Sequence, residues 1–166
     1  AGVPRVSEFD LNTTYTDKSY IRAQMVSEMQ LDVGMVSPEI FPVQVRQNGA
    51  FYSVALMVEN PDTDFLLRRG LDPDGAYYKA PTNNFYDTSS TFEKKTRLYE
   101  AGKADLDTLI TNLALTGTAL ETYVFDNVDL PGMVNYIATT CITQNIDASD
   151  KNHFAYRDTN NTGEWN

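Results

Sequence analysis

The stretch NIDASDKNHFAYRD, residues 145–158, gathers carboxylates, carboxamides and the only histidine of the chain just after an apolar segment. Asp147 is followed at the fifth position by Asn152, which is the spacing of a phosphoryl-transfer catalytic loop. A carboxylate there can accept the proton of an attacking hydroxyl, and an Asn oxygen can help to hold Mg²⁺. The spacing has little specificity, because 15 Asp and 13 Asn residues give about one such pair by chance.

Two other side chains in this stretch compete with that pair. Asp150 is a second carboxylate three residues after Asp147, and we interpret it as a solvated loop acid. His153 stands beside Asn152 at the start of an aromatic run, where local packing or hydrogen bonding is the preferred interpretation over contact with nucleotide or metal.

A helix before this stretch and a strand after it must position these groups. In the predicted helix 131–143, Asp129 is a plausible N-cap ahead of Pro131. The helix carries one apolar face, made of Met133, Val134, Ile137, Cys141 and Ile142. The run HFAYRD, residues 153–158, is the predicted strand.

The helix 131–143 needs an apolar partner, and the preceding segment offers one. Apolar residues at helical spacing predict a helix near residues 105–115. We expect the two helices to pack through Leu109, Leu113, Ile137 and Cys141, which makes the single cysteine a buried apolar residue.

The first half of the chain indicates a helix followed by a hairpin. Residues 14–34 carry apolar side chains at helical spacing and end at Gly34, which suits a C-terminal cap. The Asn48-Gly49 dipeptide predicts a turn between strands near 43–46 and 51–58. Residues 61–91 contain many turn residues around a short AYYK segment, and we expect a long loop there. This order predicts an α+β protein.

Composition limits the classes of function. The 166 residues and 18.6 kDa indicate a single domain, and the net charge of −10 disfavours nucleic acid as a partner. No apolar run approaches the roughly 20 residues that span a bilayer, so we expect no membrane span. The acidic runs 72–75 and 158–163 could be calcium loops, but turns explain both more simply.

Several segments together resemble the kinase domain of the spore coat protein H (CotH) family. The resemblance rests on the segments DKSYIRAQMVSEMQLDVGMVSPEIFPVQVRQNGAFYSVALMVENPDTDFL, GAYYKA and LPGMVNYIATTCITQNIDASDKNHFAYRDTNNTGEW. It runs in order from about Asp17 to Trp165. It implies a protein-kinase-like fold that transfers the γ-phosphate of ATP, with Mg²⁺, to Ser or Thr hydroxyls of proteins.

The resemblance gives roles to several residues. It makes Asp147 the base and Asn152 a metal ligand. Lys79 could contact phosphate as a point charge, although a lone Lys at a strand end more often faces solvent. Glu28 or Glu59 could orient a phosphate-binding lysine, and Glu28 is preferred because its helix phase turns it partly toward the core. The role of the family's Arg, at position 22 here, stays open.

The chain resembles only the central part of that domain. Family members continue into a strand that ends in Trp-Asp-x-Asp and carry further strands upstream. We therefore expect residues 1–166 to form one partial domain that binds Mg²⁺-ATP weakly by itself. The implied location is extracellular, at a cell surface or in a spore coat. The alternative is a noncatalytic surface or coat module that retains the fold and works through protein contacts.

Overall fold

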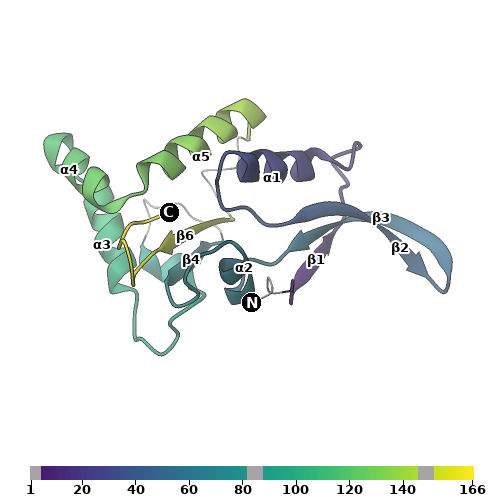
Figure 1. The fold of residues 1–166 in the computed structure, drawn as a ribbon, viewed down its shortest axis with the longest axis horizontal. Helices are drawn as coiled ribbons and strands as arrows, with labels where there is room; N and C mark the ends of the chain where they lie inside the picture. Colours follow the sequence, from purple (N-terminus) through teal and green to yellow (C-terminus); the bar gives the residue numbers. More distant parts are fainter. Residues whose placement is uncertain (1–4, 82–87, 146–151) are drawn as a thin grey trace. The chain divides into compact units, whose positions relative to one another are not determined.

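The computed structural model describes residues 5–81, 88–145 and 152–166. Within these residues the protein is α+β, with five α-helices and two small antiparallel sheets, which confirms the predicted class (Figure 1). The chain divides into two compact units, residues 1–70 and 71–166. The expectation of a single partial domain stays a prediction.

The first unit is built on a three-stranded sheet in the order β1-β3-β2, with β1 at Phe9–Asn12, β2 at Ile40–Gln47 and β3 at Ala50–Glu59. The strands β2 and β3 form the predicted hairpin. Asn48 and Gly49 between them have φ angles of 52° and 82°. Positive φ at both positions is what a type I′ turn requires, so the Asn-Gly dipeptide explains the hairpin directly.

The predicted first helix is α1, Arg22–Asp32. The Asp17 carboxylate accepts hydrogen bonds from the backbone N–H groups of Ser19 and Arg22 ahead of its first turn. The side of the helix that carries Met25 is not its buried side. Met25 is 58% exposed, whereas Ser27 is buried and donates its hydroxyl hydrogen to the Pro38 carbonyl. The helix is therefore held beside the start of β2 by polar contacts.

Two elements of the first unit were not predicted. The segment β1 has all four residues exposed, so no alternation marks it as a strand. The helix α2, Thr63–Arg68, lies inside the predicted loop 61–91. The side chain of Asp62 caps α2 by accepting the Phe65 N–H at 2.8 Å. The turn residues 60–62 therefore begin a helix, as Asx residues at an N-cap often do.

The second unit contains the other sheet, in the order β5-β4-β6, with β4 at Ala76–Ala80, β5 at Glu93–Lys94 and β6 at His153–Arg157. A short 3₁₀ helix, η1, covers Ser89–Thr91. The strand β6 confirms the prediction for residues 153–158, and β4 contains the AYYK segment. Because β4 is central, it receives hydrogen bonds from both sides.

Three helices complete the second unit: α3 (Ala104–Leu113), α4 (Gly117–Asn127) and α5 (Leu130–Thr143). Two of them, α3 and α5, match the predicted helices, and α4 was not predicted. The Asp129 carboxylate accepts the Gly132 N–H, which confirms the expected N-cap of α5.

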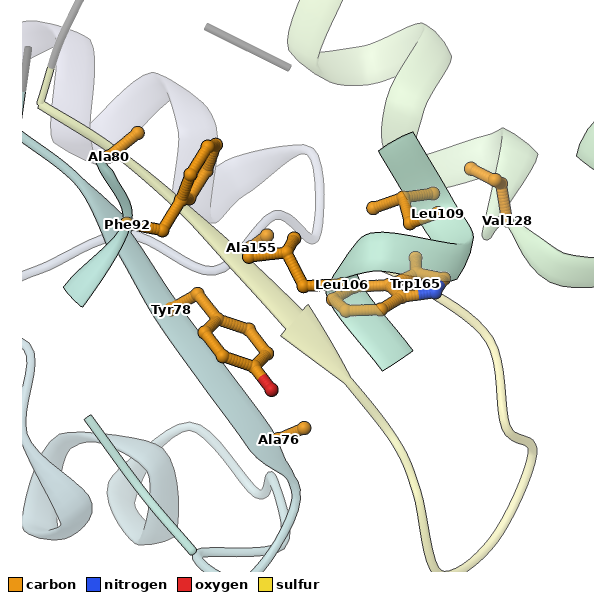
Figure 2. Close-up of a cluster of buried hydrophobic side chains, with 9 residues drawn as sticks. All are labelled: Ala76, Tyr78, Ala80, Phe92, Leu106, Leu109, Val128, Ala155 and Trp165. Carbon is orange, nitrogen blue, oxygen red and sulfur yellow. The ribbon is translucent and has the colours of Figure 1, made fainter. Parts of the chain in front are cut away.

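The core of the second unit lies between the sheet and α3 (Figure 2). Its buried side chains come from β4, β6, α3, the loop before β5, the junction between α4 and α5, and the C-terminal residues: Ala76, Tyr78, Ala80, Phe92, Leu106, Leu109, Val128, Ala155 and Trp165. The Tyr78 hydroxyl donates to the Asp105 carboxylate at 2.5 Å, which satisfies its polar end. Burial of this ring and of Leu106 each contributes roughly 2 kcal/mol.

The predicted packing of the helices near 105–115 and 131–143 through four apolar residues is wrong. Leu109 is buried and Leu113 packs against the core, but Ile137 is 54% exposed and Cys141 is exposed. Trp165 lies in the buried core that contains Leu109. The Trp165 backbone donates to the Asn127 carbonyl at 2.8 Å, and its ring closes the core.

In the part of the chain that the structure describes, no helix is long and apolar enough to cross a membrane.

Candidate functional site

The candidate site is the end of the β4–β6 pair in the second unit. Asn152 precedes β6, and its backbone N–H donates to the Ala80 carbonyl at 2.7 Å. Asn152 has a φ angle of 58° and an exposed side chain. Asn tolerates this left-handed conformation better than most residues. The backbone of the predicted metal ligand is therefore fixed beside the end of β4. Asp147 and Asp150 lie outside the described residues.

Lys79 lies one residue before Ala80 on β4 and is half-buried. Its register partners are Phe154 on β6 and Glu93 on β5. The Lys79 Nζ lies 5.8 Å from the centroid of the Phe154 ring, which is a cation–π geometry. The Glu93 carboxylate is paired instead with Lys95, at 3.2 Å.

Within the described residues, no carboxylate lies within ion-pair distance of Lys79. The other half-buried cations of the second unit have hydrogen-bond partners. Lys94 and Arg97 pair with Glu100, Lys103 donates to two backbone carbonyls, and Arg157 donates to the Gly163 carbonyl. A half-buried ammonium over an aromatic ring can accept an anionic ligand without first breaking an ion pair.

His153 follows Asn152 at the start of β6 and is half-buried. Its ring meets Phe92 edge to face, with 6.4 Å between centroids. Burial lowers the pKa of His153 below its ordinary value. These features agree with the interpretation of His153 as a packing residue.

Glu59 is 2% exposed and lies at the end of β3 in the first unit. Its carboxylate pairs with Arg68 at 3.1 Å and Arg69 at 3.8 Å, and it accepts the Glu39 N–H at 3.0 Å. Glu59 therefore forms ion pairs with Arg68, the last residue of α2, and with Arg69, which follows it. No pattern in the sequence indicated these partners, because α2 was predicted as a loop.

Glu28 belongs to α1 in the first unit. It is exposed, so the expectation that it faces partly toward the core is wrong. Its carboxylate accepts a hydrogen bond from the Gln24 amide at 2.7 Å. Glu28 is exposed because the buried side of α1 is the one that carries Ser27, not the one that carries Met25. Arg22, whose role was left open, pairs with Asp17 at 3.5 Å.

The two acidic runs form turns, as expected. The Gly75 N–H donates to the Asp72 carbonyl at 3.0 Å, which closes a β-turn. The Asp158 side chain accepts hydrogen bonds from Asn161 and Thr162, so it folds its own turn. In the described ranges, no three His, Cys, Asp or Glu residues are grouped to hold a metal ion.

The donor set at the β4–β6 end fits magnesium and phosphate chemistry in part. The exposed Asn152 carboxamide offers one hard oxygen, the ligand type that Mg²⁺ prefers. Lys79 offers one positive charge. The described residues thus bring together two of the predicted site residues, Lys79 and Asn152, while Glu28 and Glu59 belong to the first unit.

Comparison with known proteins decides the family. The model of the family described as CotH kinase protein matches residues 1–166. The chain belongs to the CotH family. It is also similar to the inner spore coat protein H of Bacillus subtilis (strain 168), with 24% identity over 162 residues. That alignment covers 90% of this chain and 45% of the relative, so the chain spans less than half of the relative's length.

Proposed function

We propose that this CotH-family chain is the central part of an atypical protein kinase with a protein-kinase-like fold. It transfers the γ-phosphate of ATP to Ser or Thr hydroxyls of proteins. The observation that carries this proposal is the position of Asn152, whose backbone is bonded to Ala80 next to Lys79. One strand pair thereby presents a metal-type oxygen ligand and a cation without a carboxylate partner in the described residues.

Each residue has a distinct role in this proposal. Asp147 orients the attacking hydroxyl and accepts its proton. Asn152 contributes an oxygen to Mg²⁺, which neutralises phosphate charge when bound. Lys79 binds a phosphate oxygen, and the Phe154 ring, 5.8 Å from its ammonium, helps to position it. Glu28 or Glu59 orients a phosphate-binding lysine. The Arg68 and Arg69 partners of Glu59 favour Glu28 for this role, because Glu28 has no ion pair among the described residues.

The proposed location is the spore coat or another extracellular surface. The support is the similarity to a protein named as an inner spore coat protein. The proposed substrates are therefore other proteins at that surface, and nucleic acid is not among the partners.

The second candidate function is a noncatalytic surface or coat module that retains a kinase-like fold. The exposed apolar side chains of α5 favour it, because such a surface serves protein contacts.

Incorporation of radiolabelled phosphate from [γ-³²P]ATP distinguishes the two candidates. The experiment uses the protein at its full natural length, with Mg²⁺ and with extracted coat proteins as acceptors. If the protein is a kinase, Ser or Thr residues of the acceptor proteins become labelled, and EDTA, which removes Mg²⁺, abolishes the labelling. Absence of labelling, together with absence of ATP binding by calorimetry, would contradict it and favour the module.

A further inference from the structure

One face of the β5-β4-β6 sheet carries the charged residues Lys79, Glu93 and Lys95. Lys79 follows the core residue Tyr78, so its side chain points to the opposite face of the sheet. Glu93 is the register partner of Lys79 and shares that face. Lys95 lies two residues after Glu93, and its N–H donates to the Tyr77 carbonyl at 2.8 Å, so it continues the strand on the same face. Two ammonium groups and one carboxylate therefore lie close together.

The Glu93 carboxylate has a choice between the two ammonium groups. Residues directly opposite each other on antiparallel strands have Cβ atoms about 4.5–5.5 Å apart, and opposite charges at such positions attract. The strand register alone would therefore pair Glu93 with Lys79. In the structure the Glu93 carboxylate instead accepts a hydrogen bond from the Lys95 ammonium at 3.2 Å.

Two contacts keep Lys79 and Glu93 apart. Strands β5 and β6 lie on opposite sides of β4. The Lys79 ammonium lies 5.8 Å from the ring centroid of Phe154 on β6, while the Glu93 carboxylate stays with Lys95 on the β5 side. Asn152 immediately precedes β6, so the Lys79 ammonium is held on the side of the sheet where Asn152 lies.

We propose that Lys95 is a positioning residue for the phosphate site, because it holds the Glu93 carboxylate and thereby leaves the Lys79 ammonium available to an anion. This inference rests on the proposed function, in which Lys79 binds a phosphate oxygen of Mg²⁺-ATP. Lys95 itself does not contact the nucleotide. The side chains of Glu93 and Lys95 are 51% and 35% exposed, so solvent weakens their pair and the effect on binding is moderate.

Calorimetric titration of the protein at its full natural length with Mg²⁺-ATP tests the proposal. Lys95→Gln releases Glu93 to pair with Lys79, and the dissociation constant should rise about two- to fivefold. Lys95→Arg keeps a cation for Glu93 and should retain the original affinity. Addition of Glu93→Gln to Lys95→Gln removes the competing carboxylate and should restore it. Thermal melts followed by circular dichroism verify that the variants fold.

A double-mutant cycle separates this pairing from a general effect of charge. Loss of any nearby cation weakens anion binding somewhat, and such a field effect would be the same in every background. If Lys95 acts by holding Glu93, then Glu93→Gln alone changes the affinity by less than about twofold, because its carboxylate is already occupied. For the same reason Lys95→Gln should have no further effect in a Lys79→Gln background.

The ligand-free protein provides a second measurement. In a sample with ¹⁵N-labelled lysine side chains, the Nζ resonance of Lys79 should shift on Lys95→Gln, because Lys79 gains a carboxylate partner. The resonance should return to its original position when Glu93→Gln is added. Loss of a purely structural contact at Lys95 would not produce a shift that Glu93→Gln reverses.

The outcomes distinguish this inference from the proposed function. If Lys79→Gln weakens Mg²⁺-ATP binding but Lys95→Gln does not, the role of Lys95 is overturned and the proposed function stands. Equal tightening by Glu93→Gln with and without Lys95 would also overturn that role, because it would show a field effect. If Lys79→Gln leaves the affinity unchanged, or the unchanged protein binds no Mg²⁺-ATP, both the phosphate contact of Lys79 and the role of Lys95 are wrong.

Discussion

The backbone N–H of Asn152 donates to the carbonyl of Ala80 at 2.7 Å, and this bond joins the predicted metal ligand to the strand that carries Lys79. Asn152 and Ala80 are 72 positions apart in the chain, and sheet pairing brings them together. The backbone of Asn152 is thus held at the end of the β4–β6 pair. Such support is what a catalytic oxygen needs to hold its geometry.

Substitution of Lys79 should weaken nucleotide binding. Lys79→Gln removes the positive charge while it keeps a similar length, and one charge-assisted hydrogen bond to phosphate is worth about 1.5–3 kcal/mol. In the protein at its full natural length, we expect the dissociation constant for Mg²⁺-ATP in calorimetry to rise by roughly 10- to 100-fold. Lys94→Gln is the control, because Lys94 already pairs with Glu100. Equal affinity of Lys79→Gln and the unchanged protein would remove Lys79 from the site.

Substitutions of Asn152 distinguish the structural role of its left-handed backbone from the role of its side-chain oxygen as a metal ligand. Asn152→Gly and Asn152→Ala both lose the ligand, so phosphoryl transfer should fall on the order of 10²-fold or more in each. Only Asn152→Ala also places a Cβ in the left-handed conformation at φ 58°, which costs about 1 kcal/mol of stability. Asn152→Asp keeps an oxygen ligand and should retain measurable activity. Full activity in Asn152→Gly would show that the side chain is not a ligand.

The Glu59 ion pairs should dominate the stability of the first unit. Glu59→Gln leaves the buried charge of Arg68 without its nearest partner and leaves Arg69 with Glu39 alone, and we expect a loss of about 3 kcal/mol in urea unfolding. Glu28→Gln is the matched control on an exposed helix position and should change stability by less than about 0.5 kcal/mol. Equal effects of the two substitutions would mean that the Glu59 pairs contribute no net stability.

Stability should depend on pH through His153. Burial lowers its pKa in the folded protein, so the unfolded chain binds a proton more readily. The neutral His153 makes its full contribution to the free energy of unfolding above the unfolded pKa of about 6.5. This contribution is lost as the pH falls through the lower pKa of the folded protein. Urea unfolding from pH 8 to pH 5 should therefore show less decline for His153→Gln than for the unchanged chain. Identical slopes would show that burial does not perturb this histidine.

Local signals predicted the elements that depend on local chemistry. The Asn48-Gly49 turn predicted the β2–β3 hairpin, and Asp129 predicted the start of α5, because each rests on backbone geometry within a few residues. The helix α2 was missed because its N-cap Asp62 stands among turn residues, and helix caps and turns favour the same residue types.

The orientation of the helices depended on long-range packing, which periodicity does not determine. The spacing of Val134, Ile137 and Cys141 correctly predicted one apolar side of α5, but not that this side is exposed. Trp165, at the far end of the chain, lies in the buried core with Leu109, one of the residues that α5 was expected to cover. At the candidate site, the adjacency of Lys79 and Asn152 likewise followed from strand pairing that only the folded structure defines.

The most direct test of the kinase proposal is phosphate transfer by Asp147→Asn in the protein at its full natural length. The substitution keeps the size of the side chain and removes the carboxylate that accepts the hydroxyl proton. Incorporation of radiolabelled phosphate into protein should fall on the order of 10²- to 10⁴-fold, as expected for loss of a general base. Asp150→Asn should have a small effect. Normal activity in Asp147→Asn, or loss only in Asp150→Asn, would contradict the assignment of the base.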